Sequence, residues 1–230
     1  MKNSNIIALC GLKNTGKDTS AGMLKFLLNT PKFLHWYWIF KSFSFIGSFG
    51  KWKTISFAKP LKEVLSIILG VPVEKFEDRD FKENYGVDLK TSKIFKIDPF
   101  NSPMMSDRFF SKYVDELSPN MFDKYCLTIR QMLQYVGTEL LRRYVSQDVW
   151  INATLKRDNL IISDLRFRRE FEALDHHKSF RILLDRPGCE PGNHASEREI
   201  MELRGDRKFE GYVNNNGTLK DLFYKLKEFV

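Results

Sequence analysis

The chain has 230 residues, 43% of them hydrophobic and 29% charged, which fits one globular domain over residues 1–230. The sequence contains no internal repeat and no low-complexity tract. Its three cysteines lack close pairing and favour reduced thiols in a cytoplasmic setting, and every apolar stretch is too short for a membrane span, so we expect no membrane partner. The net charge of +8 suggests an anionic partner, either nucleic acid or a phosphorylated small molecule, or simply a solvated basic surface.

Apolar periodicity predicts strands and helices that alternate along the chain. In chain order these are a strand at 5–10, a helix at 17–29, a strand at 54–58, helices at 59–69, 128–144 and 146–157, a strand at 159–163, a helix at 168–174, a strand at 179–184, a helix at 197–204, a strand at 209–215 and a helix at 218–229. This alternation predicts an α/β fold, a parallel sheet of about five strands with helices on both faces.

Two segments do not follow the alternation. Residues 32–53 hold many aromatic side chains and predict a packed hairpin or an extended helix end, with a membrane-touching, partner-binding or dimer surface as alternatives. Residues 71–125 are mixed and polar, with several Pro, Asp and Lys residues, and predict a mobile or irregular lobe.

The stretch GLKNTGKDT, residues 11–19, fits a phosphate-binding loop at every position but one. A strand precedes it and a helix follows, so backbone N–H groups and the helix N-terminus can meet a phosphate. Gly11 and Gly16 permit the close turn, and Lys17 is placed to lie between the β- and γ-phosphates. The stretch therefore predicts a nucleotide site.

The exceptional position is Asp18, because the usual motif places Ser or Thr directly after the lysine. The hydroxyl comes one residue later, at Thr19, from where it can still reach Mg²⁺ or a phosphate in the first helical turn. Mg²⁺ tolerates water in most of its coordination positions, so the ion can be held largely through water.

Two further groups of residues are candidates for chemistry. Asp164 ends a buried strand, where an open α/β sheet binds ligands, and can orient a metal-bound water or cap the next helix; Arg166 follows it. Within 128–144, Arg130, Gln134 and Gly137 lie on adjacent turns, with a possible surface ion pair between Glu139 and Arg143 alongside. A helical glycine costs about 1 kcal/mol relative to alanine, so something is expected to approach Gly137 closely.

Six segments, in order along residues 5–226, resemble the deoxynucleoside monophosphate kinases of bacteriophages. They are GLKNTGKDT, ISFAKPLKEVL, TIRQMLQYVGTELLRR followed by QDVW, IISDLRFRREFEAL, NHASERE and YVNNNGTLKDL. The resemblance implies a P-loop kinase with a lid at 186–197 and an acceptor-side lobe at 71–125. It also implies transfer of phosphate from ATP, with Mg²⁺, to a deoxynucleoside 5′-monophosphate.

The resemblance further implies site residues by matching position. Those expected to bind ATP are Gly11, Lys13, Asn14, Thr15, Gly16, Lys17, Asp18, Thr19, Arg186, Asn216 and Gly217. Those expected to line the acceptor pocket are Lys59, Arg130, Gln134, Gly137, Thr138, Glu139, Arg142, Asp148, Trp150, Arg166, His194 and Ser196. Catalytic roles are expected for Lys17, Arg130, Asp164 and Arg166, and Mg²⁺ ligation for Thr19 and Asp164.

Other functions remain open from the sequence. A dephospho-coenzyme A kinase shares the NNNGTLKDL segment, and a nucleic-acid-associated P-loop ATPase would use the basic charge and the aromatic side chains for stacking. A scaffold that binds nucleotide without catalysis is a third possibility. No ordered basic stripe indicates a specific nucleic acid, and a homodimer is possible. The base of the acceptor is not predicted.

Overall fold

The computed structural model describes residues 4–98, 100, 102–106, 108, 110, 125–191, 195–206 and 209–230, without the side chains of 138, 139, 195, 196 and 206. Residue contacts divide the chain into two compact units. Unit 1 comprises Met1–Phe57 and Thr154–Val230, and unit 2 comprises Ala58–Ala153. The predicted acceptor-side lobe, 71–125, falls within unit 2.

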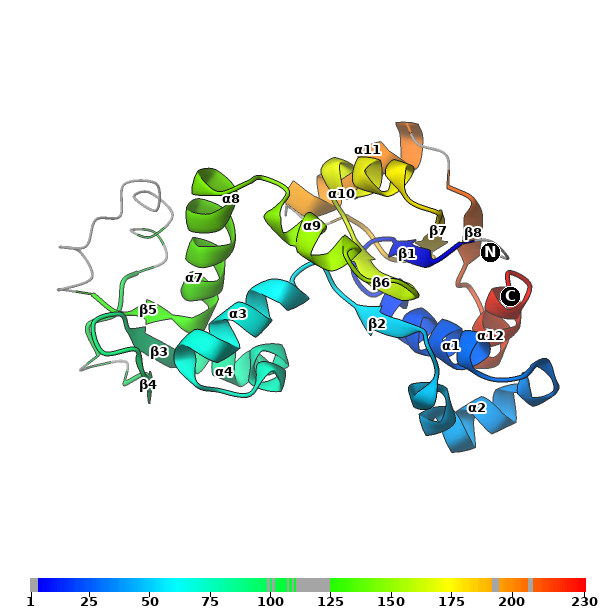
Figure 1. Ribbon diagram of the computed structural model, residues 1–230, viewed down its shortest axis with the longest axis horizontal. Helices are drawn as coiled ribbons and strands as arrows, with labels where there is room; N and C mark the ends of the chain where they lie inside the picture. The colour runs from blue at the N-terminus through cyan, green and yellow to red at the C-terminus, as the bar shows by residue number, and fades with distance from the viewer. Residues whose placement is uncertain are drawn as a thin grey trace. The chain divides into compact units, whose positions relative to one another are not determined.

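A parallel sheet forms the centre of unit 1, as the sequence predicts (Figure 1). Its strands in the described part of the chain are β1 Ile6–Cys10, β2 Lys53–Ile55, β6 Leu160–Leu165, β7 Ser179–Asp185 and β8 Gly211–Asn214. They lie in the order β2-β6-β1-β7-β8, and every neighbouring pair is parallel. All residues of β1 are buried, because helices cover both faces of the sheet.

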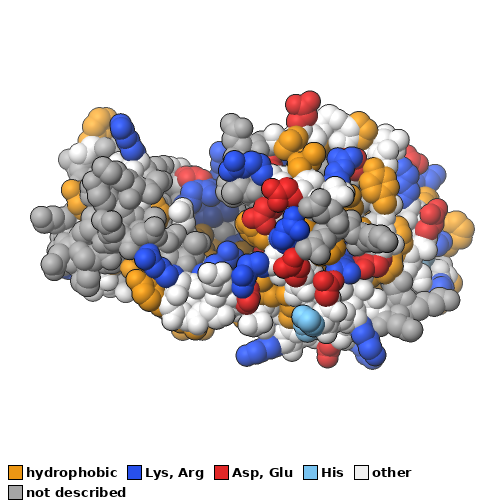
Figure 2. Space-filling view, turned by 90° about the horizontal axis from the view of Figure 1, so that it is seen from above, with side chains coloured by type: hydrophobic (Ala, Val, Ile, Leu, Met, Phe, Trp, Pro, Cys, Tyr) orange, Lys and Arg blue, Asp and Glu red, His pale blue; other side chains and the backbone are white. Residues whose placement is uncertain are grey.

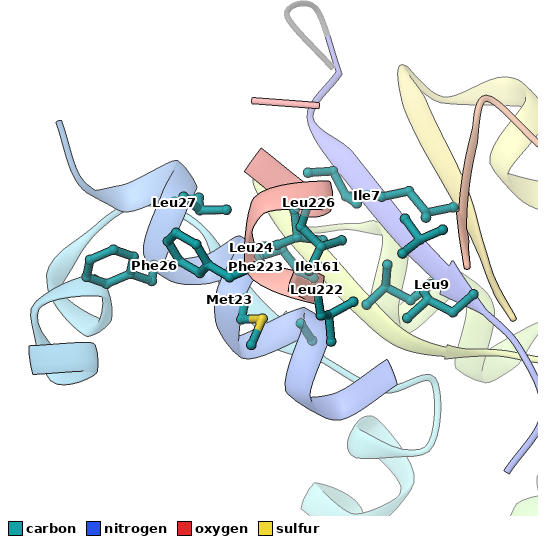
Figure 3. Close-up of a cluster of buried hydrophobic side chains, with 14 of the residues drawn as sticks. Ile7, Leu9, Met23, Leu24, Phe26, Leu27, Ile161, Leu222, Phe223 and Leu226 are labelled. Carbon is teal, nitrogen blue, oxygen red and sulfur yellow. The ribbon is translucent and has the colours of Figure 1, made fainter. Parts of the chain in front are cut away.

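Figure 1 shows α1 and α12 on one face of this sheet and α10 and α11 on the other. Their bounds are α1 Lys17–Asn29, α10 Arg168–Ala173, α11 Ala195–Asp206 and α12 Leu219–Lys227. Two shorter helices of the unit are α9 Val149–Leu155, which begins in unit 2, and η6 Leu174–His176. Figure 3 shows the core between β1, β6, α1 and α12, with Leu24, Ile161 and Phe223 at its centre.

The aromatic segment 32–53 forms short helices, so the hairpin that the sequence favours is wrong. They are η1 Lys32–Leu34, α2 Tyr37–Phe43 and η2 Ser44–Phe49. In Figure 1, α2 lies beyond α1 and α12, on the side away from the sheet. The physical reason is helical spacing, because Tyr37 and Phe40 lie three residues apart and both rings pack against Phe223.

The first turn of α12 is closed by a reciprocal pair of hydrogen bonds. The backbone N–H of Asp221 donates to Thr218 Oγ1 over 3.2 Å, and the Thr218 N–H donates to Asp221 Oδ2 over 2.8 Å. The pair is a capping box, with Thr218 as the N-cap residue of the helix.

Thr218→Ala is expected to lower the free energy of unfolding by about 1 kcal/mol, because a backbone N–H of the first turn loses its acceptor. Urea denaturation measures the change. Lys220→Ala, a replacement of an exposed residue in the same turn, serves as the control and leaves stability within about 0.5 kcal/mol. Equal effects of the two substitutions would show that the cap contributes nothing.

Unit 2 contains regular elements where the sequence predicts an irregular lobe. Its elements in the described part of the chain are α3 Lys59–Leu69, η3 Val73–Glu77, α4 Arg79–Asn84, β3 Tyr85–Asp88, β4 Lys93–Lys96, β5 Leu127–Thr128, α7 Ile129–Gln134, the π-helical segment η5 Tyr135–Leu140 and α8 Leu141–Tyr144. The strands form an antiparallel sheet in the order β4-β3-β5. Phe76 and Phe81 join Leu65, Leu127 and Ile129 in a second core, which supplies the burial that orders this segment.

Candidate active site

The predicted phosphate-binding loop lies at the switch point of the parallel sheet. The chain leaves β1 toward β2 on one side, whereas it leaves β7 toward β8 on the other, and β1 and β7 are neighbours. In open α/β sheets the carboxyl ends of two such strands border a ligand-binding crevice. Residues 11–16, which follow β1, therefore lie where this fold places a ligand.

Close contacts with β7 and β8 shape the loop. A Cβ added at Gly11 would lie 2.5 Å from the backbone oxygen of Leu184, and Gly16 has a left-handed φ of +96°. The Thr15 hydroxyl donates to Leu12 O over 2.9 Å, and Asn215 Nδ2 donates to Thr15 O over 2.9 Å. The two glycines are thus required by space and by backbone conformation, and the loop is held before any ligand arrives.

Asn215 is a residue that the sequence-based site assignment missed. It is buried directly after β8. Its Nδ2 donates a hydrogen bond to Thr15 O, 200 residues away in the sequence, and this bond holds the loop in place. The NNNGT segment signals a nucleotide contact here, but the assignment stops at Asn216 and Gly217, and only the fold brings Asn215 against the loop.

Lys17 folds its side chain back over the loop. Its Nζ donates to Gly11 O over 2.7 Å and to Leu12 O over 2.6 Å. Burial lowers the pKa of Lys17, and the positive charge of Arg166 lowers it further, while Asp18 and Glu197 act in the opposite direction. A phosphate bound against the loop would favour the charged form of this lysine, so the site is electrostatically suited to an anion.

Asp164 lies within β6 and does not cap the following helix. Its Oδ1 accepts from the backbone N–H of Phe57 over 2.9 Å, which ties β6 to the chain that follows β2. The start of α10 is instead satisfied by buried Glu170, whose Oε2 accepts from the N–H groups of Arg166 and Phe167. Glu170 thereby fixes the backbone from which the Arg166 side chain extends.

The remaining donor-side residues surround the loop in different ways. Arg186 Nη1 donates to Asn14 O over 3.4 Å, which places one predicted ATP contact against the loop. Asn216 Oδ1 accepts from Lys225 Nζ over 2.8 Å at the turn into α12. The side chains of Lys13, Asn14, Asp18 and Thr19 are exposed.

Several of the predicted acceptor residues lie in unit 2, on α3, α7 and the segments that follow. Lys59 opens α3, half-buried, and Gln134 is exposed at the end of α7. Arg130 pairs with Glu83 of α4, and its Nε donates to Glu83 Oε1 over 2.8 Å. This hydrogen bond is the main reason that the pKa of Glu83 is lowered.

Gly137 and Trp150 belong to the packing of unit 2. A Cβ at Gly137 would lie 2.6 Å from Leu61 Cδ2, so the close neighbour expected at this glycine is a leucine of α3. Trp150 is buried in the second core, and its Nε1 donates over 2.8 Å to Gly137 O. This carbonyl lies in η5, the π-helical segment, which the sequence does not predict; such segments often occur at functional sites.

Arg142 in α8 is the acceptor candidate with an unused donor. Its Nε is buried and has no hydrogen-bond partner within the described residues. The N–H of Asp148, another candidate, donates to Ser146 Oγ over 3.2 Å. The side chains of Thr138, Glu139 and Ser196, and the whole of His194, lie outside the described residues.

The residues around the loop fit Mg²⁺ only as an ion shared with phosphates. Within the described ranges, no group of three or more His, Cys, Asp or Glu side chains could hold a metal by itself. Asp18, Thr19 and Asp164, the predicted ligands and their neighbour, carry side-chain oxygens, which are the ligand type that Mg²⁺ prefers. Such a set suits an ion that keeps most of its ligands as water and phosphate oxygens.

Comparison with known proteins identifies relatives among viral nucleotide kinases. A protein of Acanthamoeba polyphaga mimivirus, named provisionally as a deoxynucleotide monophosphate kinase, is 29% identical over 117 residues, with 43% of this chain and 59% of the relative covered. The deoxynucleoside-5′-monophosphate kinase of Escherichia phage T5 is 29% identical over 142 residues, with 52% and 57% covered. The chain thus spans somewhat more than half the length of these relatives, and no protein-family model matches it.

Proposed function

Because this chain is a relative of the deoxynucleotide monophosphate kinases, we propose that it uses ATP and Mg²⁺ to convert a deoxynucleoside 5′-monophosphate into the diphosphate. The observation that carries the proposal is the loop at residues 11–17. It follows β1 at the sheet's switch point, carries Lys17 over its carbonyls and opens α1. This arrangement supports binding of the donor's phosphates.

The proposed reaction needs alignment more than it needs a strong base. A phosphate monoester has a second pKa of about 6, so the acceptor oxygen is already largely ionised at neutral pH. That oxygen forms a bond to the γ-phosphorus as the bond to the β,γ-bridging oxygen breaks, and ADP leaves. The protein's task is to bring two anions into line and to offset their repulsion.

The cationic side chains are assigned to the two substrates by their place in the fold. Lys17 and Arg186 contact the loop and would bind the donor, and Arg166 lies within electrostatic reach of Lys17. Arg130 and Arg142 of unit 2 would bind the acceptor phosphate. Asp18, Thr19 or Asp164 would help to hold Mg²⁺, which would supply charge neutralisation when bound. We also propose that the lid at 186–197 and the acceptor-side lobe at 71–125 close over the substrates and exclude water.

Arg130→Ala is expected to raise the KM for the acceptor about tenfold or more, because a charge-assisted hydrogen bond to phosphate contributes roughly 1.5–3 kcal/mol. The KM for ATP should stay unchanged. Glu83→Gln is the matched control, since it removes the negative charge beside Arg130 but keeps the guanidinium. Steady-state kinetics with both substrates varied measure the two KM values and kcat. If the acceptor KM and kcat of Arg130→Ala were unchanged, Arg130 would not bind the acceptor phosphate.

The proposed function is tested with the four deoxynucleoside monophosphates and their ribose counterparts, each with ATP and Mg²⁺, by release of ADP and formation of the diphosphate. We expect transfer to at least one deoxynucleotide. Transfer to dephospho-coenzyme A alone, or DNA-stimulated ATP hydrolysis without transfer, would overturn the proposal. ATP binding without any turnover would indicate a scaffold instead.

A further inference from the structure

The segment 32–53 has one face in the core and one face in solvent. On the inner side, the Phe40 ring lies 5.5 Å from both Phe26 and Phe223, and Tyr37 lies 5.9 Å from Phe223. These contacts continue the core of unit 1 onto α2. They account for the inner rings of the segment, whereas Phe43 and Phe45 contact each other and Trp36 lies beneath Lys227 Nζ.

Six aromatic side chains of the segment are exposed, and we name them together the aromatic face. They are Phe33, Trp36, Trp38, Phe43, Phe45 and Phe49. Phe49 is 85% exposed, Phe33 is 74% exposed and Trp38 is 62% exposed. Six large apolar rings within 17 residues form an exposed concentration of the kind that marks an interaction surface, whereas scattered single exposures do not.

The charged residues of the segment that carries the aromatic face have one sign. No acidic residue occurs in the sequence between Asp18 and Glu63, and the segment itself carries four lysines, namely Lys32, Lys41, Lys51 and Lys53. On the face drawn in Figure 2, by contrast, Lys and Arg side chains are mixed with Asp and Glu side chains. An anionic partner complements this segment, whereas a second copy would bring like charges together across a two-fold axis.

The chemistry of the segment favours a lipid surface over a nucleic acid. Four of the six rings are phenylalanine, which has no group to read a base, and the chain has no arginine before Arg79. Arginine provides the bidentate contacts typical of nucleic-acid phosphates, whereas lysines reach lipid headgroups from apolar stems. Tryptophan and phenylalanine beside lysine are typical of segments that lie in a membrane interface.

We propose that the aromatic face docks unit 1 onto an anionic phospholipid surface, with the rings in the headgroup region and the lysines against the lipid phosphates. The sequence predicts no membrane partner because no stretch reaches spanning length, but docking needs no span. Within the described residues, no helix has the length and apolar character to cross a bilayer. The inner leaflet facing the cytoplasm is anionic, which agrees with the predicted location.

Sedimentation of the full chain with vesicles tests the proposal. We expect binding to vesicles of phosphatidylcholine mixed with phosphatidylserine to exceed binding to phosphatidylcholine alone by about tenfold or more, and to fall at high salt. The fluorescence of Trp36 and Trp38 should shift to the blue on binding. Trp38→Ser with Phe45→Ser should lose at least about tenfold in binding, and so should Lys41→Glu with Lys51→Glu, which keeps every ring.

Ile67→Ser is the matched control, because Ile67 is 83% exposed on α3 in unit 2. It should bind vesicles as the unaltered protein does, and thermal unfolding checks that all variants are folded. Equal binding to both kinds of vesicle, or no effect of the two double variants, would overturn the proposal. So would preferential binding of single-stranded DNA, or a dimer in sedimentation that Trp38→Ser with Phe45→Ser dissociates without any vesicle binding.

Discussion

Lys17→Ala is expected to lower kcat for phosphoryl transfer by about 10³-fold or more while unit 1 stays folded. The proposed transition state spreads negative charge over the transferred phosphoryl oxygens, and a preorganised cation beside it is comparable to other charged groups whose loss costs 10³ to 10⁵ in rate. Lys17 is preorganised by its bonds to Gly11 O and Leu12 O. The half-buried ammonium therefore needs little rearrangement when phosphate binds.

Single-turnover kinetics with saturating ATP measure this loss, and urea denaturation checks the fold. Lys25→Ala is the matched control, because Lys25 lies on the same helix and its Nζ reaches only Ser48 Oγ, over 3.4 Å. The control should retain its rate within about twofold. Near-normal turnover of Lys17→Ala would exclude residues 11–17 as the donor site.

Gly11→Ala should weaken ATP binding by more than about tenfold and lower the free energy of unfolding by about 1–3 kcal/mol. The added methyl group would lie 2.5 Å from Leu184 O and 2.8 Å from Thr15 Oγ1. Leu184 O is a backbone atom of the central sheet and cannot move aside as the end of a side chain can. The loop must shift instead, and the N–H groups that would face the phosphates shift with it.

For Gly22→Ala, a substitution in the same helix as Lys17, we expect the opposite change in stability and no change in ATP binding. Apart from the local backbone of the helix and the two chain neighbours, no described heavy atom lies within 4 Å of a Cβ added at Gly22, so alanine should stabilise α1 by about 0.5–1 kcal/mol and leave ATP affinity unchanged. Calorimetric titration with ATP and urea denaturation measure both variants. If Gly11→Ala bound ATP as tightly as Gly22→Ala, the close fit of the loop against β7 would have no role in binding.

The strand, loop and helix around residues 11–17 could be predicted closely from the sequence, and the packing within unit 2 could not. The loop, its flanking strand and its helix are local in the chain, so the spacing of Gly11, Gly16 and Lys17 is enough to predict them. In unit 2, Gly137 and Trp150 are expected at the acceptor pocket by resemblance alone, and the structure adds that Trp150 lies in the second core and donates to Gly137 O. A buried contact between distant residues leaves no local pattern.

The sequence by itself determined the alternating elements of unit 1 and the phosphate-binding loop, because apolar periodicity, helix caps and glycine spacing act over a few residues. Only the tertiary structure decided which distant residues bond to one another at the loop and at the neighbouring strands. Asn215 donates to Thr15 O across 200 residues of sequence, and Asp164 accepts from Phe57 N across 107, which are separations that a linear pattern cannot encode. The tertiary structure also divided the aromatic segment into a packed and an exposed face, because burial depends on which surfaces meet in space.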